Sequence, residues 1–291
     1  MRFTAGLTIA LAALLAAPAV GQDPSMRPYQ ESRTRASAPT LIARYGPDEL
    51  RSGHLRLPEG KGPFPVAVIV HGGCWRADFD NINGLSALAD ALAKRGVATW
   101  AIGYRRLGDA GAGWPGTFQD VSAGVDHIAV LAKKHRLDMK RVSIVGHSAG
   151  AHLALWAASR AKLGGAWRPK VKPVSVVAID GPGALAPFVG IDEGQCGRPV
   201  ITELMGGKPA DRAAEYRLAT PADHLPLGMR QLLVQGTFTP FMAPYAAAAR
   251  AAGDPVEVLQ AGQQHFDVVT PGTPNGDKVV DLIVARAFAP R

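Results

Sequence analysis

The serine of the pentapeptide GHSAG, at positions 146–150, is the side chain best placed to act as a nucleophile. The pentapeptide follows a short β-branched run, 142–145, and precedes an alanine-rich stretch, so the sequence predicts a sharp turn from strand to helix. Glycines at both ends of the turn remove side chains that would clash across it. Ser148 would then stand at a helix N-terminus, where backbone N–H groups stabilise developing negative charge. This pattern is typical of a nucleophile elbow and indicates a hydrolase.

A glycine pair after the first predicted strand is the candidate for stabilising an oxyanion. The segment 71–75 reads HGGCW. The amides of Gly72 and Gly73 could point at a carbonyl oxygen together with the amide of Ala149, which follows the nucleophile. We expect His71 to be a structural hydrogen-bonding residue, because it belongs to this loop and precedes the serine.

His265 is the candidate general base. It follows the last predicted strand, within the segment 261–267, AGQQHFD, and comes after the serine in the chain order typical of this architecture. Six of the other seven histidines are considered and expected to be structural: His71, His127, His135, His147, His152 and His224.

The acid that should orient the histidine is less evident. Only one acid between Ser148 and His265 directly follows a predicted strand, and that is Asp180, so it is the preferred candidate. A serine–histidine dyad without an acid is one alternative, and another acid from the same interval is the second. Those other acids are Asp192, Glu193, Glu203, Asp211, Glu215, Asp223, Asp254 and Glu257.

Apolar runs and helical stretches alternate along the chain, which predicts one α/β domain with a mostly parallel central sheet. Residues 181–230 interrupt the alternation and are a candidate for a small cap over the site. Strands are expected at 66–70, 97–104, 142–145, 174–179, 232–235 and 256–259, and helices at 85–94, 117–135, 151–156, 243–252 and 277–288.

Composition limits the function classes. The 291 residues are 47% hydrophobic and 19% charged, with a formal charge of +8 and a pI of about 9.7. Basic residues are scattered and not interleaved with aromatic residues, so nucleic-acid binding is not expected. Cys74 and Cys196 are the two cysteines, and the sequence leaves open whether they form a disulfide or stay as free thiols.

The N-terminus predicts export. Residues 1–21 combine Arg2, an apolar stretch and small residues before Gln22, as in a cleavable signal peptide. Residues 22–40 are expected to be a flexible leader and residues 41–291 the hydrolase domain. The protein would be secreted or periplasmic without stable membrane insertion, and an uncleaved anchor is the alternative.

From Leu55 to Phe288 the sequence resembles the α/β-hydrolase superfamily. It is most similar to the branch with hormone-sensitive-lipase-like and feruloyl-esterase-like proteins and kynurenine formamidases. The resemblance rests on HGGCW at 71–75, GHSAGAHLA at 146–154 and GQQHFD at 262–267. It implies an aspartate at the position of Thr239, so the sequence departs from the family pattern there.

Together these residues predict a serine hydrolase that cleaves a small carboxylic ester, with no metal or organic cofactor. Ser148 would attack, His265 would accept the proton, and an acyl-enzyme would form. Trp75, beside the oxyanion loop, is the first candidate for substrate contact, with Phe188 and Phe241 as further candidates. An amidase or arylformamidase of the same fold, or a non-catalytic binding protein, are the alternatives.

Overall fold

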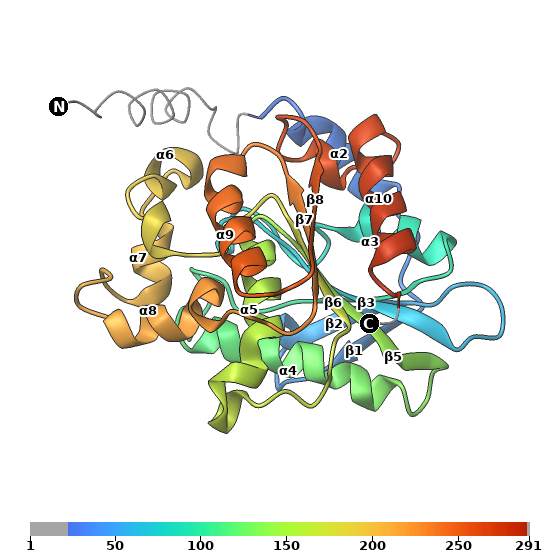
Figure 1. The fold of residues 1–291 in the computed structure, drawn as a ribbon. Coiled ribbons are helices and arrows are strands. Elements are labelled where there is room, and N and C mark those ends of the chain that lie inside the picture. Colours follow the sequence, from blue (N-terminus) through green and yellow to red (C-terminus); the bar gives the residue numbers. More distant parts are fainter. Residues whose placement is uncertain (1–22, 290–291) are drawn as a thin grey trace.

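An eight-stranded sheet forms the centre of the molecule (Figure 1). The computed structural model describes residues 23–289. The strand order is β1-β2-β4-β3-β5-β6-β7-β8; β1 and β2 are antiparallel additions, and every pairing from β4 to β8 is parallel. The strands are β1 (Leu41–Arg44), β2 (Ser52–Arg56), β3 (Phe64–Val70), β4 (Ala98–Ile102), β5 (Leu137–His147), β6 (Ser175–Ile179), β7 (Arg230–Gln235) and β8 (Val256–Gln260).

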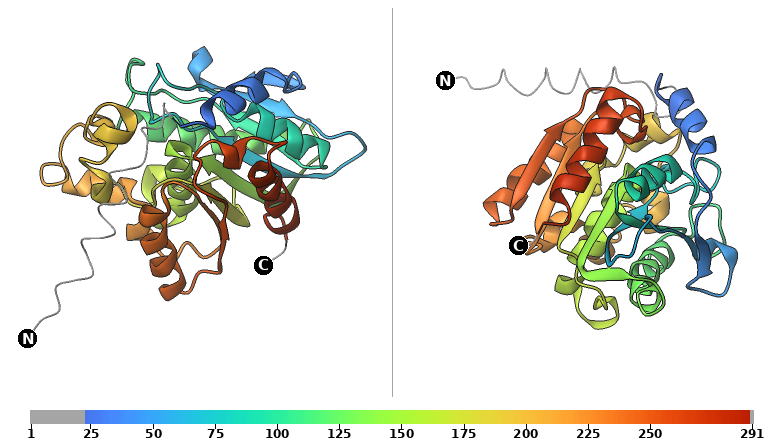
Figure 2. Two further views of the ribbon diagram at one scale, coloured as in Figure 1. Left: turned by 90° about the horizontal axis from the view of Figure 1, so that it is seen from above. Right: turned by 90° about the vertical axis from the view of Figure 1, so that its right-hand side faces the viewer.

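Helices cover both faces of this sheet. The sheet is built outward from β3 in both directions, so right-handed crossovers place α3 on one face and α4, α5 and α9 on the other. Helix α10 contacts α3 and lies on the same face of the sheet, as the right-hand view of Figure 2 shows. The helices are α3 (Ser86–Lys94), α4 (Gly116–Leu131), α5 (Ala149–Leu163), α9 (Thr239–Ala251) and α10 (Pro274–Arg286).

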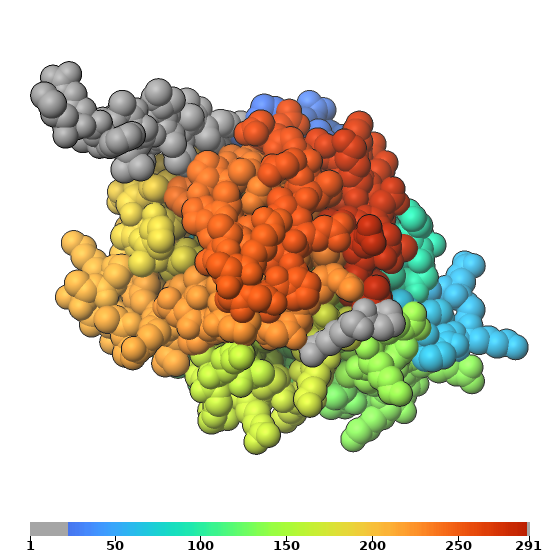
Figure 3. All heavy atoms as spheres, in the orientation of Figure 1, coloured from blue at the N-terminus to red at the C-terminus, as the bar shows by residue number. Residues whose placement is uncertain are grey.

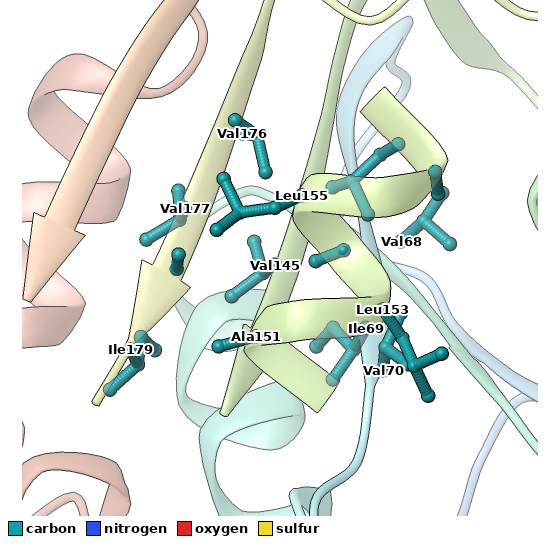
Figure 4. Packing of buried hydrophobic residues seen from close by; sticks show 14 of the residues in the cluster. Val68, Ile69, Val70, Val145, Ala151, Leu153, Leu155, Val176, Val177 and Ile179 are labelled. Atoms are coloured by element: carbon teal, nitrogen blue, oxygen red, sulfur yellow. The ribbon is translucent and has the colours of Figure 1, made fainter. Parts of the chain in front are cut away.

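The middle strands are buried on both faces, which explains their continuous apolar sequences. Every residue of β6 is buried, and the side chains of β3, β5 and β6 pack under helix α5 (Figure 4). Val145, Leu155 and Val177 are fully excluded from solvent in this layer. The turn between β5 and α5 therefore rests on a fully buried part of the core.

Residues 181–229 leave the sheet after β6 and return to it at β7, as the sequence predicts for a cap. This excursion contains η4 (Ala186–Phe188), α6 (Asp192–Cys196), α7 (Val200–Met205), α8 (Ala213–Ala219) and η5 (Pro221–His224). In the space-filling view its yellow-to-orange atoms form one side of the molecule beside α9 (Figure 3).

The N-terminal segment differs from the expected flexible leader. Residues 26–34 form helix α2 (Met26–Thr34), which contacts α3 and the 3₁₀ turn η6 (Asp267–Val269). Tyr29 is 2% exposed, so this polar stretch is anchored to the domain, and the folded unit includes residues before position 41. The predicted signal peptide, 1–21, lies outside the described residues.

None of the helices between residues 23 and 289 combines the length and the apolar character that a bilayer span requires.

Candidate active site

The turn at Ser148 has the backbone of a nucleophile elbow. Ser148 adopts φ 56° and ψ −123°, a left-handed conformation that is rare outside glycine. The turn is tight, because a Cβ on Gly146 would lie 2.0 Å from the carbonyl oxygen of Gly150. The Ser148 amide donates to the carbonyl of Ile179 (2.9 Å), which ties the turn to the end of β6. Strain of this kind persists where the surrounding fold enforces it, and it often marks a functional site.

His265 and Asp180 form a buried pair. The Nδ1 atom of His265 lies 2.7 Å from Oδ2 of Asp180, and the two side chains are 1% and 0% exposed. The Nε2 atom of His265 is also buried and has no hydrogen-bond partner within residues 23–289. A carboxylate on Nδ1 favours the tautomer with its proton there, which leaves Nε2 free to accept one.

The turn after β7 holds the Asp180 carboxylate in place. Oδ1 accepts the amides of Gly236 (3.0 Å) and Phe238 (2.8 Å), and Oδ2 accepts the amide of Thr237 (3.0 Å). A Cβ on Gly236 would stand 2.9 Å from the carboxyl carbon, so only glycine permits this approach. Three amide donors and the imidazole thus compensate the burial of one negative charge.

Thr239 does not reach the histidine. It begins α9, and its hydroxyl donates to the carbonyl of Gly236 (2.7 Å). The structure therefore brings the preferred sequence candidate, Asp180, to His265. Of the other acids considered, Asp192 and Asp254 are buried elsewhere and accept backbone amides.

The oxyanion loop lies directly against the nucleophile. A Cβ on Gly72 would be 3.0 Å from Cβ of Ser148, and Gly73 has a φ of +97° that suits glycine. The hydroxyl of Tyr104 donates to the carbonyl of His71 (2.7 Å), and the His71 ring donates to the carbonyl of Gly72 (2.9 Å). His71 is structural, as the sequence predicts, and it holds the glycine amides beside Ser148.

Burial keeps the structural histidines of the site neutral. Desolvation lowers the pKa of His71 and of His152 to about 4. Desolvation, and then the neighbouring His265, lower the pKa of His147 well below its usual value. Neutral His147 donates from Nε2 to the backbone carbonyl of His265 (2.9 Å), so it supports the backbone of the His265 loop.

A small cavity opens beside Ser148. Its volume is ≈ 10 Å³, about the space of one water molecule. The candidates Trp75 and Phe188 line it, whereas Phe241 stands behind Phe188 at a ring distance of 4.3 Å. Cys74 of the oxyanion loop lines it as well. Sequence reasoning missed the remaining wall, because it comes from separate segments: Pro182, Cys196 and Phe238.

A disulfide joins Cys74 to Cys196, with 5.9 Å between the Cα atoms. It links the oxyanion loop to helix α6 of the excursion across a separation of 122 residues. Arg76 adds a hydrogen bond from its guanidinium to the carbonyl of Cys196. The question that the sequence left open is therefore answered in favour of pairing, and the pair forms one wall of the cavity.

Reduction of this disulfide is expected to destabilise the protein by about 2–5 kcal/mol, because a long loop is released in the unfolded chain. Thermal unfolding with and without a phosphine reductant measures the effect as a fall in Tm. The double variant Cys74→Ser/Cys196→Ser is the control and should unfold at the same temperature in both conditions. A wild-type Tm that ignores the reductant would contradict this role.

Within residues 23–289, no group of three or more His, Cys, Asp or Glu side chains is placed to hold a metal ion.

A protein-family model named BD-FAE matches residues 55–240. Kynurenine formamidase from Meyerozyma guilliermondii is 30% identical over 114 residues, 39% of this chain and 40% of the relative. Esterase EstD from Thermotoga maritima is 30% identical over 136 residues, 44% of this chain and 32% of the relative. The matches thus span less than half the length of these curated relatives.

Solved structures share the fold. Esterase B from Lactobacillus rhamnosis superimposes with a TM-score of 0.74 at 17% identity, covering 96% of this chain and 94% of the other. Est2, an esterase from Thermogutta terrifontis, gives 0.67 at 16% identity, with 86% and 96% covered. The sheet, the flanking helices and a family match over more than half of the sequence place this chain in the BD-FAE family of α/β-hydrolase esterases.

Proposed function

We propose that this protein is an exported serine hydrolase that cleaves small carboxylic esters through an acyl-enzyme on Ser148. The observation that carries the proposal is the 2.7 Å contact between His265 and Asp180, behind a serine at a strained elbow. His265 accepts the serine proton at Nε2 and then gives it to the leaving alcohol. The amides of Gly72, Gly73 and Ala149 stabilise the tetrahedral oxyanion. Water then attacks the acyl-enzyme and releases the acid.

The cavity beside Ser148 is the proposed acyl site. The leaving alcohol must lie next to Nε2 of His265 to receive its proton, and His265 does not line the cavity. The acyl side chain therefore occupies the cavity, between the oxyanion loop and Phe188. The small volume of this cavity, ≈ 10 Å³, supports a short acyl group such as acetyl.

Acyl-chain length tests this assignment. We expect kcat/KM on p-nitrophenyl acetate to exceed that on the butyrate ester by about tenfold to a hundredfold, since overpacking costs about 1–3 kcal/mol. Phe188→Ala is the matched variant: it enlarges the cavity and should raise activity on butyrate relative to acetate. A wild type that prefers butyrate or octanoate would contradict the acyl assignment.

Export is part of the proposal. The predicted signal peptide, 1–21, supports it, and the disulfide between Cys74 and Cys196 is of a kind that persists in oxidising compartments.

An arylformamidase is the second candidate, because one 30% identical relative is named kynurenine formamidase. A formyl group also fits a cavity of ≈ 10 Å³. Turnover of N-formyl aryl amines compared with aryl acetates separates the two activities. The non-catalytic alternative rests on Thr239, and the place of Asp180 beside His265 supports the catalytic proposal instead.

A further inference from the structure

The backbone of His265 is held by side chains on both sides. Its amide donates to Oδ2 of Asp23 (2.7 Å), and its carbonyl accepts Nε2 of His147 (2.9 Å). The loop needs such support, because residues 262–264 are exposed and His265 itself is 1% exposed. The contact with Asp23 comes from the N-terminal segment, far away in the sequence.

The same segment holds the residue after the base. The Phe266 amide donates to the hydroxyl of Ser25 (3.0 Å), and the Ser25 amide donates to Oδ1 of Asp23 (2.7 Å). The ring of Tyr29 lies 4.8 Å from the ring of Phe266. The two oxygens of Asp23 are therefore divided: Oδ1 fixes its own segment and Oδ2 fixes the catalytic loop.

The other end of the segment contacts Asp80, which packs against the oxyanion loop. The Tyr29 hydroxyl donates to Oδ2 of Asp80 (2.7 Å), and Arg33 pairs with Oδ1 of Asp80 (3.2 Å). Burial, and then the charge of Asp80, raise the pKa of Tyr29 well above its usual value, so the hydroxyl stays a donor. Asp80 packs against Gly73 so closely that a Cβ there would lie 2.5 Å from Cβ of Asp80.

We propose that residues 23–34 form an N-terminal clasp that positions the His265 loop and the oxyanion loop relative to each other. This inference rests on the proposed function, since it assigns Asp23 as a positioning residue for the base. Helix α2 lies beside the red C-terminal elements in Figure 1 and contacts η6. The clasp therefore packs against the segment that directly follows His265. The predicted cleavage before Gln22 would leave the whole clasp in the mature protein.

The substitution Asp23→Asn tests the clasp. An amide offers one acceptor oxygen, so either the His265 amide or the Ser25 amide must face an NH₂ group. We expect kcat on p-nitrophenyl acetate to fall by about tenfold to a hundredfold, because small displacements of a catalytic group cost about this much. KM should stay within about twofold, since Asp23 does not line the cavity.

Glu31→Gln is the matched control on the same segment. Within residues 23–289, the Glu31 side chain forms an ion pair only with exposed Arg27. The variant therefore removes one charge without touching either loop, and it should keep wild-type kcat. Ser25→Ala provides a second variant if Asp23→Asn folds poorly, and it should lower kcat in the same direction. Hydrogen exchange should show faster exchange at the amides of His265 and Phe266 in both clasp variants.

Three results would overturn the clasp. The first is an Asp23→Asn enzyme with unchanged kcat, and the second is a loss of kcat that only follows the unfolded fraction measured by Tm. An equal loss in Glu31→Gln would also overturn it. Failure of the proposed function would look different, because turnover would then survive in Ser148→Ala whatever the result at Asp23.

Discussion

Ser148→Ala is expected to lower kcat on p-nitrophenyl acetate by on the order of 10⁶-fold, to the background of the remaining site. The hydroxyl oxygen of Ser148 forms the bond to the acyl group, and no neighbouring side chain can replace it in the same position. Alanine tolerates the left-handed φ of 56° about as well as serine does, so the fold should survive. The loss therefore reports on chemistry.

Labelling by a fluorophosphonate probe measures the same property independently. Wild type should be labelled at Ser148, and Ser148→Ala should not. Ser159→Ala is the matched control, because Ser159 is a buried serine on the same helix, α5, whose hydroxyl donates to the carbonyl of Trp156 (2.8 Å). It should retain labelling and turnover. A folded wild type that resists the probe would support the non-catalytic alternative.

The parallel strands could be predicted from sequence because burial on both faces produces unbroken apolar runs, as in β3 and β6. Strand β1 lies at the sheet edge and alternates between half-buried and exposed residues, so its four residues carry a weak signal. Helix α2 is polar overall, and single contacts such as Tyr29 with Asp80 fix it to the domain. Contacts of this kind have no local periodicity, which is why the segment was expected to be flexible.

The positions of Ser148 and His265 in the fold could be predicted because each residue lies in a short motif after a predictable strand. The acid was harder, since its partners depend on how β6 and β7 pair. Ile179 pairs with Val234, which sets Asp180 beside the turn that begins at Gly236. The pairing of β6 with β7 thus supplies the amides that compensate the buried Asp180 carboxylate. This pairing cannot be read from the sequence of either strand alone.

Asp180→Asn is expected to lower kcat by about 10⁴-fold, because the carboxylate sets the tautomer of His265. The amide oxygen of an asparagine would stay with the amides of Gly236 and Phe238, which Oδ1 of Asp180 accepts now. Its NH₂ group would then face Nδ1 of His265. A donor at Nδ1 favours the tautomer with the proton on Nε2, and that nitrogen cannot accept the serine proton.

Asp254→Asn separates this effect from the cost of altering any buried carboxylate. Asp254 is 5% exposed and accepts the amides of Leu227 and Gly228 and the side chain of Gln231, near the opposite end of β7. Its amide variant should lose stability, since a buried donor meets another donor, yet kcat should stay close to wild type. Measurement of kcat and Tm for both variants distinguishes the two effects. If Asp180→Asn kept near-normal kcat, the hydrogen bond to His265 would be structural only, and Ser148 and His265 would work as a dyad.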